Sequence, residues 1–152
     1  MTQSVVHLAK VLPCPDEAVS IEIERMLQFI AAWFRGECEP GAFQKGFAEA
    51  LHPEFQRIQP SGRPLDRIQM IDALRDANGA SRFFRVEARN IRLVRSTDGT
   101  SIATYEEHQR GARNSDIVNV RHAMVLFEHG PRLRWRYVHE TSIAGGRITA
   151  IL

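Results

Sequence analysis

The 152-residue chain lacks most of the features that would assign it to a protein class at once. It has only two cysteines, Cys14 and Cys38, which argues against a disulfide-stapled scaffold. Because no secretion leader is visible either, a reducing cytoplasm is expected. No apolar run reaches the roughly 18 residues that span a bilayer, so a soluble protein without a membrane partner is expected.

Charge of one sign is also scarce. The formal net charge is +2, and basic residues alternate with acidic ones instead of clustering, so nucleic acid is not an expected partner. Internal repeats, low-complexity tracts and linkers are absent, which gives no reason to expect a second domain. We therefore expect one domain over residues 1–152, with residues 1–14 and 145–152 as terminal extensions.

Motifs for metal, phosphate and nucleophilic chemistry are missing as well. The chain has no Cys-x-x-Cys, His-x-His or His-Glu-x-x-His pattern and no glycine-rich phosphate loop, so neither a metal nor a cofactor is expected. His108, His122 and His139 fall on neighbouring expected strands and could meet at a metal. Their spacing does not support that interpretation over scattered structural or surface histidines.

The first half of the chain predicts helices, because its apolar residues recur three and four positions apart. Asp66 and Gln69 form a capping box that marks the start of the third helix. A short strand over residues 55–59 is expected before it. The expected helical segments are residues 15–36, 40–53 and 66–79, ended by Gly36, Pro53 and Asn78-Gly79.

From Arg82 onward the pattern changes to long alternating runs separated by three turns, which predicts four successive antiparallel strands. In the first of them the apolar parity slips by one residue near Arg89 and Asn90, which predicts a bulge that bends the sheet. Helices followed by a meander indicate an α+β fold. We expect three N-terminal helices on one face of a strongly curved antiparallel sheet, a cone-shaped α+β barrel around a hollow.

The closing strand, residues 133–143, is the most informative segment. One parity is mainly aromatic and is predicted to face the core, which indicates a small-molecule pocket. His139 beside Tyr137 could serve there as acid, base or hydrogen-bond donor. The alternative is a core histidine satisfied by a backbone carbonyl or by Glu106. The predicted inner set is Leu133, Trp135, Tyr137, His139 and Thr141.

The sequence leaves the orientation of Glu106 open. If its side chain faces inward, burial would raise its pKa and make it a candidate base. An inward ion pair with Arg57 or Arg121 would instead keep it charged, and a solvated position on the outer face is equally compatible with the pattern.

Arg121 raises the same question on the next strand. The residues of opposite parity are more apolar, so they are predicted to face the core and to leave Arg121 on the outer face or at a dimer interface. If Arg121 points inward, the hollow should prefer a carboxylate ligand, because a guanidinium offers that group two hydrogen bonds. The predicted inner set is Val118, Val120, His122, Met124 and Leu126.

This order of elements, with residues 31–37 (AAWFRGE) ending the first helix and residues 135–142 (WRYVHETS) closing the sheet, resembles the nuclear-transport-factor-2-like (NTF2-like) superfamily. The closing strand looks most like bacterial relatives of the calcium/calmodulin-dependent kinase association domain and SnoaL-like proteins. The resemblance implies a cystatin-like cone, a pocket between sheet and helices, and frequently a dimer through the outer sheet face. It implies no single activity, since this fold hosts isomerases, dehydratases, epoxide hydrolases and binding or assembly modules.

The ketosteroid isomerase branch of this superfamily needs a carboxylate base near the first short strand and a tyrosine on the first helix. The corresponding places in this chain hold Gln59 and Phe29, and neither can perform that chemistry, so steroid isomerisation is not expected.

The sequence thus favours a homodimeric domain that binds a small organic molecule. The alternatives are a proton-transfer enzyme (isomerase, dehydratase or hydrolase) and an oligomeric assembly module. The candidate catalytic residues are His139, Glu106 and Tyr137, and the candidate ligand-lining residues are Phe29, Trp33, Gln59, His122 and Trp135.

Overall fold

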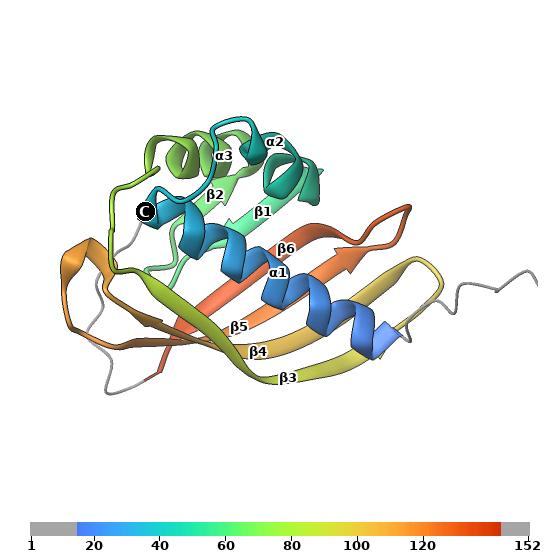
Figure 1. Cartoon of the computed structure of the whole chain (residues 1–152). Coiled ribbons are helices and arrows are strands. Elements are labelled where there is room, and N and C mark those ends of the chain that lie inside the picture. Colours follow the sequence, from blue (N-terminus) through green and yellow to red (C-terminus); the bar gives the residue numbers. More distant parts are fainter. Residues whose placement is uncertain (1–14, 144–152) are drawn as a thin grey trace, which may run out of the picture.

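The computed structural model describes residues 15–143, in which helices cover one face of a six-stranded sheet (Figure 1). Among these residues no helix combines the length and apolar character needed to cross a membrane. The elements are α1 (Pro15–Arg35), α2 (Ala42–Gly46), the 3-10 turn η1 (Ala48–Ala50), β1 (Leu51–Ile58), β2 (Pro64–Asp66), α3 (Arg67–Asp76), β3 (Arg85–Ser96), β4 (Thr100–Arg110), the 3-10 turn η2 (Ala112–Asn114), β5 (Asn119–Glu128) and β6 (Arg134–Ser142).

The sheet confirms the predicted α+β arrangement. Its strand order is β2-β1-β6-β5-β4-β3, and β3 to β6 form the expected antiparallel meander. The pairing of β1 with β6 is parallel, so the sheet is mixed and not antiparallel throughout. Strand β2 was not predicted, because three residues are too few to display an alternating pattern.

Helix α1 ends where it was predicted to end, and helix α3 begins where it was predicted to begin but stops at Asp76, before the predicted Asn78-Gly79. Helix α1 ends at Arg35, and Gly36 follows with a φ of 75°, a left-handed conformation that costs glycine little. Helix α3 has the predicted capping box: the Asp66 side chain accepts from the Gln69 backbone N–H at 2.8 Å, and Gln69 Oε1 accepts from the Asp66 N–H at 2.9 Å.

The second predicted helix, residues 40–53, is too long. The helix ends at Gly46, and β1 already begins at Leu51, so Pro53 lies inside a strand. The register between β1 and β6 shifts between Leu51 and Gln56, and Pro53 falls in this irregular stretch. A proline is tolerated there because no regular ladder hydrogen bond needs its missing N–H.

The predicted bulge in the first strand of the meander is confirmed. Asn90 has a φ of 53°, and the register of β3 against β4 shifts between Arg89 and Arg92. The bulge bends the sheet so that it curves beneath α1, which lies across it, while α2 and α3 cover the end near β1 and β2 (Figure 1). The core lies between these helices and the inner face of the sheet.

A second bulge, in β6, overturns the predicted inner face of the closing strand. Trp135 pairs with Phe127 and Tyr137 pairs with Leu126, so Arg136 is an extra residue. The parity therefore reverses after Trp135. The buried residues of β6 are Trp135, Val138 and Glu140, whereas Tyr137 is half-buried, and His139 and Thr141 are exposed on the outer face.

The predicted inner face of β5 is also wrong. Asn119, Arg121, Ala123, Val125 and Phe127 are buried, whereas His122 and Met124 are exposed and Val120 and Leu126 are half-buried. The prediction failed because it equated the more apolar parity with the core. Here polar inner residues are buried among partners on neighbouring strands, which hydrophobic alternation cannot reveal.

Candidate functional site

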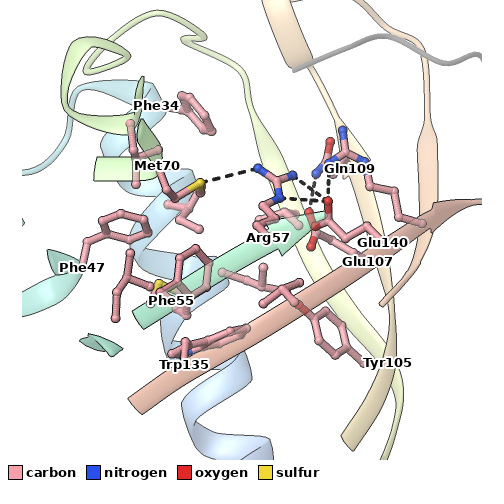
Figure 2. Close-up of a pocket in the computed structure, with 18 of the residues that line it drawn as sticks. Phe34, Phe47, Phe55, Arg57, Met70, Tyr105, Glu107, Gln109, Trp135 and Glu140 are labelled. Atoms are coloured by element: carbon pink, nitrogen blue, oxygen red, sulfur yellow. Dashed lines mark hydrogen bonds and ion pairs between the residues drawn. The ribbon is translucent and has the colours of Figure 1, made fainter. Parts of the chain in front are cut away.

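A cavity, here called the chamber, lies between α1, α3 and the inner face of the sheet (Figure 2). It holds about 70 Å³ of space open to the centre of a water molecule, which is room for a few waters or a small organic group. Apolar side chains line most of its wall, among them Met26 on α1, Phe55 on β1, Met70 on α3 and Trp135 on β6. Such a wall suits an apolar ligand.

One end of the chamber is polar. Four strands bring together five side chains that we call the polar cluster, and each is at most 7% exposed. All five line the chamber. The members are Arg57 on β1, Glu107 and Gln109 on β4, Arg121 on β5, and Glu140 on β6. Figure 2 labels all of them except Arg121.

Glu140 is the hub of the polar cluster. Its Oε2 accepts from Arg57 Nη2 at 2.6 Å, from Arg57 Nε at 3.0 Å and from Arg121 Nη1 at 3.3 Å. Burial alone would lower the pKa of Arg57, but the charge and hydrogen bonds of Glu140 more than offset this, so that pKa lies above its ordinary value. Both guanidiniums are therefore cations inside the fold.

The second carboxyl group of the polar cluster behaves differently. Burial raises the pKa of Glu107 above its ordinary value, and the nearby charge of Glu140 raises it further. The charge of Arg121 and a hydrogen bond donated by Gln109 Nε2 oppose the rise without cancelling it. Glu107 therefore takes up a proton more readily than an ordinary glutamate.

Tyr105 adjoins the polar cluster on β4 and lines the chamber. Burial raises the pKa of its phenol well above 10, with the charges of Glu107 and Glu140 adding to the rise. The phenol is therefore neutral at physiological pH, and it can donate a hydrogen bond but cannot act as a base.

Arg121 has one donor that nothing in the described structure accepts. The residue is 3% exposed, and its Nη1 binds Glu140, but its Nε has no hydrogen-bond partner among residues 15–143. A buried donor without an acceptor is unusual in a folded protein, because the desolvation of such a group costs free energy. Arg121 is also among the residues that line the chamber.

Only one of the predicted ligand-lining residues lines the chamber. Trp135 lines the chamber, and its Nε1 donates to Glu22 Oε1 at 2.9 Å. Trp33 does not line it. Its Nε1 donates a hydrogen bond to the carbonyl of Leu74 at 2.7 Å, and Leu74 does line the chamber. Phe29 stacks on Trp33 with the ring centroids 6.0 Å apart, outside the chamber wall.

The remaining two ligand candidates also lie away from the chamber wall. Gln59 is buried at the end of β1 but does not line the cavity. His122 is exposed on the outer face of β5, where it lies opposite Glu106.

The three candidate catalytic residues lie on the outer face. The prediction that Tyr137 and His139 line the hollow is therefore wrong, and Glu106, whose orientation the sequence left open, faces outward. Tyr137 Oη is 3.3 Å from Nδ1 of the exposed His139. Glu106 Oε2 is 3.0 Å from His108 Nε2, and hydrogen bonds from His108 and Asn90 hold the pKa of Glu106 below its ordinary value. That shift keeps Glu106 ionised and makes it a weaker base.

A metal site finds no support in the part of the chain that the structure describes, because no group of three candidate ligands comes together there. Cys38 is half-buried, and burial raises the pKa of its thiol, which makes it a poor nucleophile. Cys14 and the expected terminal extensions 1–14 and 145–152 lie outside the described residues.

The sequence analysis missed the polar cluster as a unit. Arg57 was considered only as a partner of Glu106, and Glu107 and Glu140 were not candidates. An inward Arg121 was one of the alternatives left open, and this is the orientation that the structure shows. A usable signal existed in β4, where Tyr105, Glu107 and Gln109 share the parity of Ala103, which is fully buried.

Comparisons with known proteins rest on structure. No family model matches the chain, and no curated protein matches its sequence. An NTF2-like protein of unknown function from Pseudomonas aeruginosa superposes with a TM-score of 0.77 at 23% identity, over 84% of this chain and 99% of that one. The fold is that of the NTF2-like superfamily. This confirms the predicted cone-shaped, cystatin-like α+β architecture.

Two further solved structures with the same fold differ in their described roles. A proposed dehydratase from Streptomyces avermitilis has a TM-score of 0.70 at 12% identity, covering 85% of this chain and 96% of its own. The CaMKII hub homology domain of Chlamydomonas reinhardtii has a TM-score of 0.66 at 12% identity, covering 84% and 97%. At these identities the likeness establishes the fold and leaves activity to the site itself.

Proposed function

We propose that this domain binds a small, largely apolar organic molecule in the chamber. The observation that carries the proposal is a cavity with an apolar wall on the helical side and a converging set of buried polar groups at its other end. This combination is typical of ligand sites, in which apolar contacts supply affinity and a few polar groups fix orientation.

Filling the chamber tests this proposal. Val138 lines it, whereas Val94 is exposed on β3, so Val138→Phe and Val94→Phe form a matched pair. The probe is 3-methylbutan-1-ol, a neutral branched alcohol, titrated into protein labelled with ¹³C on its methionine methyl groups. We expect saturable shifts with the parent protein and Val94→Phe, and none with Val138→Phe. Equal binding by both variants would place the alcohol elsewhere and contradict the proposal.

We further propose that two copies associate through the outer face of the sheet. Met124 is exposed there, and half-buried Val120, Leu126 and Tyr137 extend the same surface. Exposed apolar residues gathered on one face are a common mark of an interface. The likeness to a CaMKII hub homology domain supports an assembly role for this fold. A larger oligomer is therefore the alternative to a dimer.

A proton-transfer enzyme is the second candidate, and a specific observation favours it. Glu107 and Glu140 share one cavity, but Glu140 is bound by two guanidiniums whereas burial raises the pKa of Glu107. Two carboxyl groups in different electrostatic environments within one cavity are typical of an acid–base active site. In this hypothesis Glu107 is the general acid, in place of the predicted His139 and Glu106.

The enzymatic hypothesis has its own test. Glu107→Gln keeps the size and the hydrogen-bond acceptor of the side chain but cannot transfer a proton. In a screen of isomerisation, dehydration and hydrolysis substrates, any turnover should fall by about 10²-fold or more in this variant while binding persists. Turnover that survives the substitution would exclude Glu107 as the acid.

A further inference from the structure

We infer that the ligand of the chamber is a small apolar monocarboxylate whose carboxylate accepts a hydrogen bond from Arg121 Nε. This inference rests on the proposed binding function and adds the chemical class of the ligand. Its basis is the set of side chains that line the chamber, and the N–H donors among them that have no acceptor.

The first observation is the geometry of the two guanidiniums. Arg121 uses Nη1 on Glu140, while its Nε has no acceptor in the described structure. Arg57 uses Nε and Nη2 on Glu140, and its Nη1 reaches only the Met70 sulfur, at 3.7 Å. A thioether is a weak acceptor. Each guanidinium thus retains an N–H suited to an anionic oxygen.

The second observation is the balance of charge in the chamber. Two guanidinium cations face the Glu140 carboxylate, and the fourth charged group, Glu107, binds a proton more readily than an ordinary glutamate. When Glu107 is protonated, the chamber carries one unmatched positive charge. A single ligand carboxylate neutralises it, whereas a dianion would exceed it.

The rest of the chamber wall favours a ligand whose non-carboxylate part is apolar. The chamber-lining residues contributed by α1, α3 and β3 are all apolar, and among the described residues no titratable group from these elements reaches the cavity. The groups that face Glu107 are therefore Arg57, Tyr105, Gln109, Arg121 and Glu140, all on the sheet. Branched aliphatic or small aromatic acids fit such a wall better than polar acids.

Ligand and Glu107 then compete as anions for the same cations, which couples binding to a proton. A carboxylate that enters the chamber favours the protonated form of Glu107, and an ionised Glu107 disfavours the carboxylate. Affinity for an acid should therefore fall as the pH rises through the pKa of Glu107. Affinity for a neutral ligand of the same shape should not change.

The experiment compares three compounds with the same branched skeleton: isovalerate, isovaleramide and 3-methylbutan-1-ol. Binding is followed by the methionine methyl shifts over a series of pH values that runs upward from about pH 5. We expect isovalerate to bind at least tenfold more tightly than isovaleramide at the acidic end, and this preference to shrink as the pH rises through the raised pKa of Glu107. Amide binding as tight as acid binding, or a preference that does not change with pH, overturns the inference.

Two variants separate the ligand class from a folding effect. Arg121→Gln should abolish the preference for isovalerate over isovaleramide. Glu107→Gln, which leaves both guanidiniums and their Glu140 partner in place, should bind isovalerate at least as tightly as the parent and without the pH dependence. A tenfold loss of isovalerate affinity in Glu107→Gln contradicts the inference even if Arg121→Gln fails to fold.

Binding of the alcohol distinguishes a failure of the carboxylate assignment from a failure of the proposed binding function. If 3-methylbutan-1-ol binds and isovalerate does not bind more tightly, the chamber is a ligand site and only the carboxylate assignment is wrong. If none of the three compounds shifts a chamber methionine, both the binding function and its ligand class are wrong.

Discussion

Each face of the sheet carries some side chains that are unusual for their surroundings. The inner face buries four charged groups, Arg57, Glu107, Arg121 and Glu140. The outer face exposes apolar side chains, with Met124 at 38%. On the inner face, charged side chains can be buried because they have oppositely charged or hydrogen-bonding partners around the chamber. On the outer face, in our proposal, a second subunit covers the exposed apolar side chains.

Ion pairs illustrate the same difference between the faces. Arg57 and Glu140 form a pair whose side chains are 8% and 5% exposed, while Arg89 and Glu87 form a pair whose side chains are 57% and 55% exposed. The chemistry is identical, but water screens only the second pair. Removing one partner of the buried pair leaves an uncompensated charge in a medium of low polarity.

Arg57→Leu should therefore have the largest effect on the folded protein. We expect the free energy of unfolding at pH 7 to fall by about 3–5 kcal/mol, because Glu140 loses two of its three hydrogen bonds. Urea denaturation measures the change. The matched control is Arg89→Leu on the exposed pair, for which a loss below about 1 kcal/mol is expected. Equal losses for the two variants would mean that the inner pair is not buried.

The outer face is tested by Met124→Lys. A lysine at this position places a charge in the proposed interface, so the dissociation constant of the dimer should rise by about 10²-fold or more in sedimentation experiments. Ile68→Lys is the control, because Ile68 is 69% exposed but lies on α3, away from the sheet. A dimer that is unaffected by the change at Met124, or an equal effect of both variants, would mean that the outer face is not the interface.

Glu107→Gln should have a smaller effect on stability, of opposite sign. Folding raises the pKa of Glu107, so the folded state holds its proton more tightly than the unfolded chain does. The stability that this group contributes is greatest below the ordinary carboxyl range and is lost as the pH rises through the raised pKa. At pH 7 the variant should therefore melt at a higher temperature than the parent. The difference should vanish toward about pH 4.

A melting temperature for Glu107→Gln that is lower than the parent's at pH 7, or a difference that grows on acidification, would show that the Glu107 carboxylate stabilises the fold. Glu106→Gln provides the matched control on the outer face. Hydrogen bonds lower the pKa of Glu106, so its stability contribution is present above the ordinary carboxyl range and is lost on acidification, the reverse dependence on pH.

His139→Ala should have the smallest effect. The side chain is exposed and does not line the chamber, so we expect stability to change by no more than about 0.5 kcal/mol and isovalerate affinity to stay within twofold. Urea denaturation measures the stability, and isothermal titration calorimetry measures the affinity. Loss of ligand binding in this variant would restore the sequence prediction and contradict the assignment of the inner face.

Local signals in the sequence were sufficient for much of the fold. The capping box of Asp66 and Gln69 and the helix end at Gly36 each depend only on residues a few positions apart in the sequence. Both predictions were confirmed. The bulge at Asn90 was predictable because purely apolar residues change parity there. These features need no knowledge of what packs against them.

The candidate site was largely missed for physical reasons. In β6 both parities contain residues that fit either face, since Tyr137 and His139 are amphipathic and Trp135 precedes the bulge, so alternation could not locate the extra Arg136. The polar cluster depends on contacts between distant segments. Arg57 and Glu140 are 83 residues apart and meet through a parallel strand pairing that one sequence does not display.

The most direct test uses the three methionine methyl groups that the structure describes. Met26 and Met70 line the chamber, and Met124 lies on the outer face of the sheet. On titration with isovalerate at pH 6, the account predicts that the Met26 and Met70 signals shift in parallel with binding while the Met124 signal stays in place. A shift of Met124 with Met26 and Met70 unchanged would place the ligand on the outer face and contradict the account.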